Sequence, residues 1–377
     1  MSRRKAIVVG AGPAGSTIAW LLAKQGFQVA VFDRRTDPAT DDYASRRSLN
    51  IAIAQNSVDL LASSGLDRPI IECTVQLSKR AIHSRSGTIT EQRYSDQIDG
   101  PSSLLTPPGG VRSGSRLDIA NALFEHVRTS QHVSFHFSSA VRAINASGGT
   151  VELASGEIIT ADLVVGADGA NSVVRSAIED RHGTHTDRSK FNYAYKELFV
   201  PADVALDGSA FHIWPRQGSL IMALPNRDGS FRASYFYPVD GVTSDSGAGV
   251  DRALALFREN HADCVRYFPQ YASELRVNPE CLMFTLTTET WYAERAALVG
   301  DACHTILPFT GMGLNLAFED CIVLSQNIEH YPDVTAAFEA YVNTRKSMTD
   351  DAAGKAKILG QIVLALLPED GVFGQIN

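Results

Sequence analysis

The sequence of 377 residues predicts an α/β fold with a parallel-sheet domain, an antiparallel-sheet domain and a C-terminal helix. Short apolar runs that lead into glycine-rich turns indicate buried parallel strands. These runs are residues 6–9, 163–165 and 296–299. Further strand-rich segments should form an antiparallel sheet. They lie at 211–214, 220–224 and 231–237. An apolar run at 358–364 predicts a helix that packs on the core.

The first apolar run enters a turn with the spacing Gly-x-Gly-x-x-Gly, formed by Gly10, Gly12 and Gly15. Gly10 allows a tight turn, Gly12 lets the backbone approach a pyrophosphate, and Gly15 lets helix and strand pack closely. The amphipathic stretch 16–24 follows, and the N-terminus of such a helix attracts phosphate. A second apolar run ends at Asp33, eighteen residues beyond Gly15, where an acid accepts hydrogen bonds from an adenosine ribose. An ordinary βαβ turn would not explain Asp33. We therefore predict a Rossmann-like dinucleotide site that includes Gly10, Gly12, Ala14, Gly15, Asp33 and Arg34.

Composition excludes several classes of function. The formal net charge is −8 and no basic stripe is present, which argues against nucleic acid as a partner. Basic residues 3–5 precede a strand rather than an apolar signal sequence, and no apolar run is long enough to span a bilayer, so we expect a cytoplasmic protein. The five cysteines show no Cys-x-x-Cys spacing, which favours reduced side chains. The loop 182–187 carries metal-ligating residue types, but its Gly and Thr favour a solvated loop, and we predict no metal site.

Two further motifs follow the other apolar runs. Asp168-Gly169 comes after the run at 163–165, and Gly300-Asp301 comes after the run at 296–299. Asp301, at the carboxyl end of a strand, lies where α/β sheets bind ligands. The structural alternative for Asp301 is a helix N-cap. A glycine-rich segment, 311–315, then opens a helix whose N–H groups and dipole can stabilise negative charge.

These three motifs, in this order and each after a strand, resemble those of the class A flavoprotein monooxygenases, which have the para-hydroxybenzoate hydroxylase fold. The resemblance covers nearly the whole chain and implies a GR2-type domain that binds FAD without a covalent link. It implies that Asp301 bonds the ribityl chain of FAD and that Asp168 serves the pyrophosphate region and NAD(P)H binding. It identifies Arg116 as the arginine at the start of a helix in that family. The other cofactor residues that it assigns are Arg47, Gly311, Gly313, Leu314 and Asn315.

The resemblance also implies a reaction. NAD(P)H reduces FAD, O2 adds at flavin C4a, and the terminal oxygen of the resulting hydroperoxide attacks an electron-rich aromatic ring. The protein binds and orients the substrate and excludes water, and no side chain need act as a covalent catalyst.

Within the family, the chain is most similar to the kynurenine 3-monooxygenases. The segments that carry this similarity are 44–52, 80–84, 195–198, 212–216 and 223–226. The arginine and tyrosine that hold the substrate carboxylate in those enzymes are fourteen residues apart, as Arg80 and Tyr94 are here. An arginine offers a fork for a carboxylate and a tyrosine adds a hydrogen bond. The alternative is that Arg80 is a surface charge and Tyr94 a packed aromatic. The remaining predicted substrate residues are Tyr195, Phe236, Pro308, Phe309 and Met312.

The chain departs from that pattern near the flavin and near the substrate. Met312 replaces a glutamine, and a thioether cannot orient a carbonyl group as an amide does. Leu359 and Ile362 align with an Asn-x-x-Glu pair, and most of the C-terminal helical region of the family falls beyond Asn377. A pocket without those polar groups predicts a different or less polar substrate than kynurenine. Kynurenine or a related tryptophan- or anthranilate-derived aromatic is the leading expectation. A secondary-metabolite hydroxylase, a flavin-dependent halogenase or reductase, and a non-catalytic flavin-binding regulator are the alternatives.

Other chemistry-bearing residues have weaker support. His83 and His212 fall in the expected substrate region and could relay protons, although single histidines on strands are more often core groups. Cys303 and His304 are neighbours whose side chains are expected to diverge, which argues against a Cys–His nucleophile. The expected FAD-binding domain comprises 1–75, 105–180 and 285–350, and the expected substrate domain comprises 76–104 and 186–284. A C-terminal helix is expected within 351–377. The sequence does not predict the oligomeric state.

Overall fold

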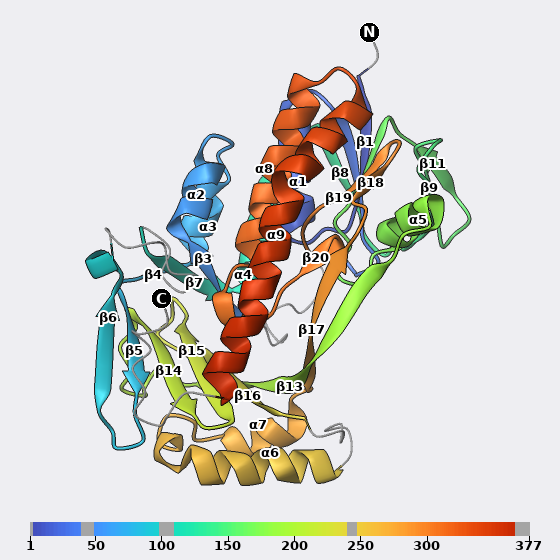
Figure 1. Ribbon diagram of the computed structural model, residues 1–377. Coiled ribbons are helices and arrows are strands. Elements are labelled where there is room, and N and C mark those ends of the chain that lie inside the picture. Colours follow the sequence, from blue (N-terminus) through green and yellow to red (C-terminus); the bar gives the residue numbers. More distant parts are fainter. Residues whose placement is uncertain (1–2, 39–48, 98–108, 240–246, 366–377) are drawn as a thin grey trace.

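The computed structural model describes residues 3–38, 49–97, 109–239 and 247–365 (Figure 1). A parallel sheet and an antiparallel sheet lie at opposite ends of the molecule, and one long helix runs between them (Figure 1). The predicted α/β fold with both sheet types and a C-terminal helix is therefore confirmed.

The parallel sheet has the strand order β18-β19-β12-β1-β2-β8. Its strands are β1 (Lys5–Val9), β2 (Gln28–Phe32), β8 (Val133–His136), β12 (Leu163–Gly166), β18 (Tyr292–Ala293) and β19 (Ala296–Leu298). All neighbours pair in parallel except β18 and β19. Three of these strands contain the predicted apolar runs. Because β1, β12 and β19 are adjacent, the glycine-rich turns that follow them lie at one edge of the sheet.

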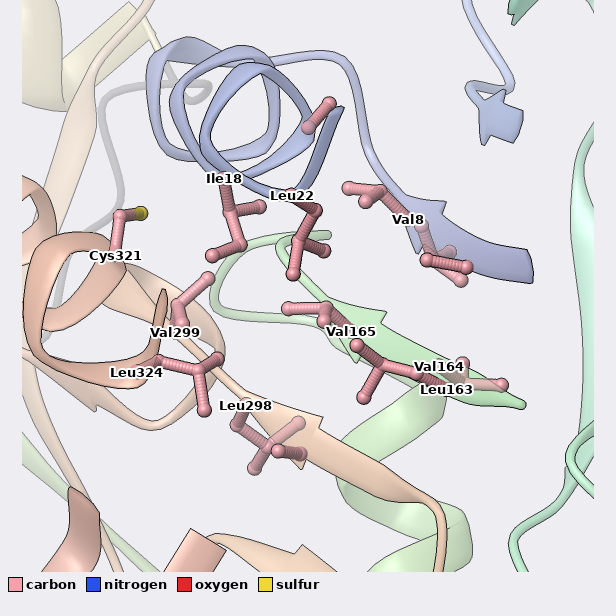
Figure 2. Close-up of a cluster of buried hydrophobic side chains, with 14 of the residues drawn as sticks. Val8, Ile18, Leu22, Leu163, Val164, Val165, Leu298, Val299, Cys321 and Leu324 are labelled. Carbon is pink, nitrogen blue, oxygen red and sulfur yellow. The ribbon is translucent and has the colours of Figure 1, made fainter. Parts of the chain in front are cut away.

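Three helices pack beside this sheet: α1 (Pro13–Lys24), α4 (Arg116–Val127) and α8 (Gly313–His330). Figure 2 shows Ile18 and Leu22 of α1 and Leu324 of α8 directed at Val165 and Leu298 of the strands. These side chains are fully buried, so their apolar surface stabilises the association of the helices with the sheet. The helix α5 (Val173–His182) contacts β9 and β19. The strands β9 (Val141–Asn145), β10 (Thr150–Leu153) and β11 (Ile158–Thr160) form a three-stranded antiparallel sheet.

A second three-stranded sheet lies between the two large sheets, with the order β3-β7-β4. Its strands are β3 (Asn50–Ala54), β4 (Val75–Leu77) and β7 (Val111–Ser115). The helices α2 (Gln55–Ala62) and α3 (Asp67–Cys73) connect β3 to β4.

The large second sheet has the order β20-β17-β13-β16-β15-β14-β5-β6. Its strands are β5 (Lys79–His83), β6 (Ile89–Arg93), β13 (Thr186–Val200), β14 (Ala210–Arg216), β15 (Ser219–Pro225), β16 (Phe231–Pro238), β17 (Cys281–Thr288) and β20 (His304–Thr305). Side chains alternate between its two faces, as in Ile213 and Trp214. Trp214 packs with α6 (Gly247–Asn260) and α7 (Tyr271–Val277), whereas Ile213 packs with the end of the long C-terminal helix.

That helix, α9 (Val334–Ala365), has 32 residues and is therefore about 48 Å long. It begins beside α8, where the Tyr341 hydroxyl donates a hydrogen bond of 3.0 Å to the carbonyl oxygen of Leu298. It ends over the large antiparallel sheet, where Leu359 and Val363 are buried (Figure 1). The boundary expected at residues 350 and 351 thus falls within one continuous helix.

Candidate cofactor and substrate sites

The first glycine-rich turn is tightly packed on one side and open on the other. Gly10 has φ +100°, and a Cβ atom there would lie 2.4 Å from the carbonyl oxygen of Ala167. A Cβ atom at Gly15 would lie 1.9 Å from the carbonyl oxygen of Gly10. Both positions therefore require glycine. Among the described residues, a Cβ atom at Gly12 would meet nothing within 4 Å and no side chain caps the first turn of α1. The start of the helix thus leaves open space and N–H groups for a phosphate.

Asp33 is buried at the end of β2 and already accepts hydrogen bonds. Its Oδ2 accepts from the Ala11 N–H at 2.7 Å. Arg35 donates to Oδ1 from Nε at 2.9 Å and to Oδ2 from Nη2 at 2.7 Å. Burial raises the pKa of Asp33, but the bonds from Arg35 and Ala11 outweigh it and hold the pKa below its usual value. A ribose at this carboxylate would therefore share it with Arg35, a partner that the sequence analysis missed. Arg34 is exposed, and Arg47 lies outside the described residues.

The second motif joins two loops. Asp168 accepts the Val173 N–H at 2.7 Å through Oδ2 and so caps the start of α5, while its buried Oδ1 has no hydrogen-bond partner among the described residues. Desolvation raises the pKa of this carboxyl group. Arg175 donates to the carbonyl oxygens of Ala170 at 2.8 Å and Ala302 at 3.0 Å. Arg175 therefore connects the Asp168 loop to the Asp301 turn. The sequence analysis did not assign this role, although the position of Arg175 directly after the motif could have indicated it.

The third motif forms a 3₁₀ turn, Gly300–Ala302, after β19. Gly300 has φ +62°, which favours glycine. The Asp301 side chain is accessible to solvent, yet protein surrounds it closely enough that desolvation raises its pKa. The charges of His304 and Arg116 oppose that rise, so Arg116 at the start of α4 lies within electrostatic reach of Asp301. Two distant parts of the sequence, Arg116 and the turn that carries Asp301 and His304, thus interact electrostatically.

The segment before α8 is held to β3 by Asn315. Its Oδ1 accepts the Ala54 N–H at 2.9 Å, and its Nδ2 donates to the carbonyl oxygens of Gly311 at 2.8 Å and Ala52 at 3.3 Å. Gly311 has φ +66° and a Cβ atom there would lie 3.4 Å from that of Ala52. Gly313 begins α8, and within the part of the chain that the structure describes no side chain caps its first turn. The N–H groups at this helix start can therefore face an electron-rich ligand. Leu314 packs beside the core of the parallel-sheet domain, and Met312 is half-buried.

Arg80 of β5 and Tyr94, directly after β6, lie together. They are 3% and 8% exposed. Arg80 donates a hydrogen bond to the Tyr94 hydroxyl, and the guanidinium carbon lies 5.8 Å from the centre of the Tyr94 ring. Desolvation lowers the pKa of Arg80 and raises that of Tyr94. Arg80 is therefore not a surface charge. Tyr94 packs with Leu77, Val111 and Leu224, so it is also a packed aromatic.

An aromatic cluster continues from this pair toward α9. Tyr195 and Phe236 have ring centres 5.5 Å apart, and Phe236 and Phe309 have ring centres 5.3 Å apart. Pro308 precedes Phe309 and is half-buried. Phe211 packs both with this cluster and with the group around Tyr94. Desolvation strongly raises the pKa of Tyr195, and its interaction with Cys281 raises it further. The predicted substrate residues from β5, β13, β16 and the loop before α8 thus share one face of the antiparallel sheet.

His83 and His212 lie on the opposite face, so the alternative of a proton relay to the substrate is wrong, and the favoured interpretation as core groups fits. Their Nε2 and Nδ1 atoms are 2.8 Å apart, and the His83 ring stacks on Trp214 at 4.3 Å. Burial lowers the pKa of His83 to about 3. These histidines belong to the core beneath α6 and α7, as single histidines on strands usually do.

The expected divergence of Cys303 and His304 is also wrong. Their ligand atoms and a carboxylate oxygen of Asp320 all lie within 4.8 Å of one another. The Asp320 oxygens, however, already accept hydrogen bonds from His304, Gly300 and Arg345. A metal ion would have to displace those donors, so these residues do not favour a metal site. Within the described ranges, the loop 182–187 contributes to no group of three metal-ligating side chains.

Three features of the described residues fit a flavin dinucleotide: an open glycine turn, an Asp168 oxygen without a hydrogen-bond partner there, and a start of α8 without a side-chain cap there. A protein-family model described as an FAD binding domain matches residues 3–352. The chain belongs to the FAD-binding monooxygenase family. It follows that the chain binds FAD. As a member of this family it is an FAD-dependent monooxygenase, and the expected cofactor is confirmed.

Curated relatives of this monooxygenase are kynurenine 3-monooxygenases. The enzyme of Salinispora tropica is 34% identical over 370 residues, which cover 92% of this chain and 78% of the relative. That of Stenotrophomonas maltophilia is 32% identical and covers 91% of this chain and 76% of the relative.

Two solved structures show the same fold. The tetrameric form of 2-methyl-3-hydroxypyridine-5-carboxylic acid oxygenase has a TM-score of 0.78 at 20% identity and covers 96% of this chain and 91% of its own. Klebsiella pneumoniae HpxO complexed with FAD and uric acid has a TM-score of 0.77 at 24% identity and covers 96% of this chain and 88% of its own. Among the described residues, no helix combines the length and the apolar character needed to cross a membrane.

Proposed function

We propose that this monooxygenase hydroxylates a small aromatic carboxylic acid with NAD(P)H and O2 as cosubstrates, and that kynurenine or a related aromatic is its substrate. The observation that carries the proposal is the buried Arg80–Tyr94 pair on the face of the antiparallel sheet that also carries the aromatic cluster. The identity of 32–34% to kynurenine 3-monooxygenases supports the substrate class.

Bound FAD supplies the redox chemistry, taking electrons from NAD(P)H and using O2 to oxidise the aromatic ring. The protein residues hold and orient the reactants. Gly12 and the start of α1 would face the pyrophosphate, and Asp301 would accept a hydrogen bond from the ribityl chain. The start of α8, positioned by Asn315, would stabilise negative charge on the flavin ring.

Arg80 gives the site its preference for an acid. The Arg80 guanidinium is 3% exposed and desolvated, so a carboxylate that pairs with it compensates a desolvation that folding has already imposed. The Tyr94 hydroxyl, already bonded to Arg80, can add a hydrogen bond to the same carboxylate. The acid would thus be anchored at one end, with its ring directed toward the aromatic cluster.

The other end of the substrate region favours an apolar group. Leu359 is buried and Ile362 half-buried on the part of α9 that covers Phe236 and Phe309. A polar substituent directed at this face would lose hydration without gaining a hydrogen bond. An aromatic acid less polar than kynurenine at its distal end is therefore the second candidate substrate.

The first experiment measures substrate-stimulated NAD(P)H oxidation and product hydroxylation with kynurenine, anthranilate, tryptophan derivatives and quinolones. We expect stimulation by an aromatic acid and not by its neutral amide. If no aromatic acid yields a hydroxylated product while FAD is bound, the proposed reaction is wrong.

The second experiment tests the carboxylate pair with the active acid. Arg80→Ala should raise KM by about 30-fold or more, since truncating one partner of a buried charge pair costs about 2–5 kcal/mol, and bound FAD should be unchanged. Tyr94→Phe should raise KM about fivefold, the effect of one neutral hydrogen bond of ~1 kcal/mol. Arg93→Ala, an exposed arginine at the end of the same hairpin, is the matched control and should behave as wild type. Unchanged affinity in Arg80→Ala would refute the carboxylate assignment.

A further inference from the structure

A buried charge cluster lies directly behind the Gly300-Asp301 turn. Asp320 of α8 is 0% exposed, and His304 and Arg345 are each 2% exposed. His304 Nε2 lies 2.6 Å from Asp320 Oδ2, and Arg345 Nε donates to Asp320 Oδ1 at 2.9 Å. Arg345 also donates to Glu319 Oε2 at 2.6 Å. The cluster joins β20, α8 and α9.

The cluster reaches the cofactor turn through one backbone bond. The Gly300 N–H donates to Asp320 Oδ2 at 3.1 Å, the same oxygen that faces His304. Gly300 is held from the other side as well, because a Cβ atom there would lie 3.0 Å from the Cβ of Ala317 and 3.5 Å from that of Ala14. The turn that presents Asp301 is therefore fixed by one carboxylate and two helices.

The charges also favour one arrangement. A carboxylate removed from water must be paired, and Asp320 has both a guanidinium and an imidazole beside it. Burial raises the pKa of Asp320, but His304 and Arg345 outweigh it and hold the pKa below its usual value. The charge of His304 also favours the ionised form of Asp301, whereas that of Asp320 opposes it. His304 thus interacts electrostatically with both carboxyl groups.

We propose that Asp320 is a positioning residue for FAD, which fixes the Gly300 N–H and the His304 ring so that Asp301 meets the ribityl chain in one orientation. Arg345 extends this arrangement to α9, the helix that also covers the aromatic cluster. Asp320 itself need not touch the cofactor. The inference uses the FAD site and is independent of which substrate is hydroxylated.

The test measures how tightly FAD is held. Purified holoprotein is diluted and the released flavin is read from its fluorescence, which gives the Kd of FAD. Asp320→Asn keeps the size of the side chain but removes its charge and one acceptor atom, and it should raise this Kd at least tenfold. Glu319→Gln is the matched control, since Glu319 is the adjacent residue on α8 and shares Arg345 but has no bond to Gly300 or His304 in the described structure. Its Kd should stay within twofold of wild type.

A double-mutant cycle separates positioning from simple stability. If Asp320 acts through Asp301, then Asp320→Asn should change the Kd less than threefold in an Asp301→Asn background, because the group it positions is already lost. A purely structural role would give the full tenfold effect in both backgrounds. Equal effects in both backgrounds, or an unchanged Kd in Asp320→Asn, would overturn the proposal.

His304→Gln provides a second route if Asp320→Asn does not fold. Glutamine can still donate to Asp320 but carries no charge. It should weaken FAD binding in the wild-type background and not in the Asp301→Asn background. If it weakens binding equally in both, or in neither, Asp320 and His304 do not position Asp301.

Discussion

Two glycines on α9 are expected to respond to alanine in opposite ways. Gly354 has open space around it, since a Cβ atom there would meet none of the described residues within 4 Å. A Cβ atom at Gly360 would lie 2.6 Å from two ring carbons of Phe309 and 3.2 Å from the Cζ of Phe191. Both positions are helical, so any difference between the variants comes from these contacts and not from the backbone.

Gly354→Ala should stabilise the protein by about 0.8–1 kcal/mol through helix propensity. For a chain of 377 residues the entropy of unfolding is roughly 0.8 kcal/mol per degree, so the expected rise in Tm is about 1 °C. Gly360→Ala gains the same propensity but forces Phe309 to move, and overpacking of this kind costs ~1–3 kcal/mol. Its net effect should be a loss of up to about 2 kcal/mol, together with a raised KM for the aromatic substrate.

The assay is urea unfolding of the holoprotein, followed by tryptophan fluorescence, for wild type, both single variants and the double variant. The urea midpoint should rise in Gly354→Ala and fall in Gly360→Ala at an unchanged slope. If Gly360→Ala is as stable as Gly354→Ala, Phe309 is free to move and the close packing of α9 on the aromatic cluster is not a constraint.

Two further predictions concern pH. Because burial lowers the pKa of His83 to about 3, the unfolded chain binds this proton more readily, and the free energy of unfolding should fall as pH drops from 6.5 toward 3. His83→Gln should flatten that slope by up to about 1.4 kcal/mol per pH unit, as measured by urea titration at successive pH values; an unchanged slope would mean that His83 is not buried. Asp207 is an acid, and it too should make the free energy of unfolding fall as pH drops. The hydrogen bond from Lys79 lowers the pKa of Asp207 to about 2, so the stabilisation from this group is present above pH 4 and lost as pH falls through 2. Since this side chain is 45% exposed, Asp207→Asn should cost less than about 1 kcal/mol at pH 7 and nothing at pH 2; a larger loss at pH 7 would show a more desolvated pair.

Local sequence patterns predicted the strands and glycine turns because those features depend on nearest neighbours. The spacing of Gly10 and Gly15 indicates positions where only glycine fits, and the structure shows close contacts there that only glycine permits. The salt bridge between Asp33 and Arg35 was not predictable, since it depends on a side-chain rotamer. The ion pair between Asp320 and Arg345 was also not predictable from the sequence, because the two residues are 25 positions apart on two helices and meet only after those helices pack.

The face on which His83 lies could be read from the sequence. Arg80 and His83 are three residues apart on one strand, and an odd separation places two side chains on opposite faces. Once Arg80 is assigned to the substrate, His83 therefore falls on the core face, in line with the favoured interpretation. One expectation was wrong: Cys303 and His304 were expected to diverge because they are neighbours in the sequence. Cys303 instead ends a 3₁₀ turn, so the two side chains converge.

The continuity of α9 has a mechanical consequence. One end is fixed to the parallel sheet through Tyr341, and the other is buried against the antiparallel sheet through Leu359 and Val363. An α-helix without proline bends little over about 48 Å. α9 therefore holds the two sheets at a fixed separation, and we expect them to move as one body. Exchange of substrate and product would then depend on loops at the edge of the site. The rigidity of α9 would keep the substrate acid at a constant distance from the flavin during each turnover.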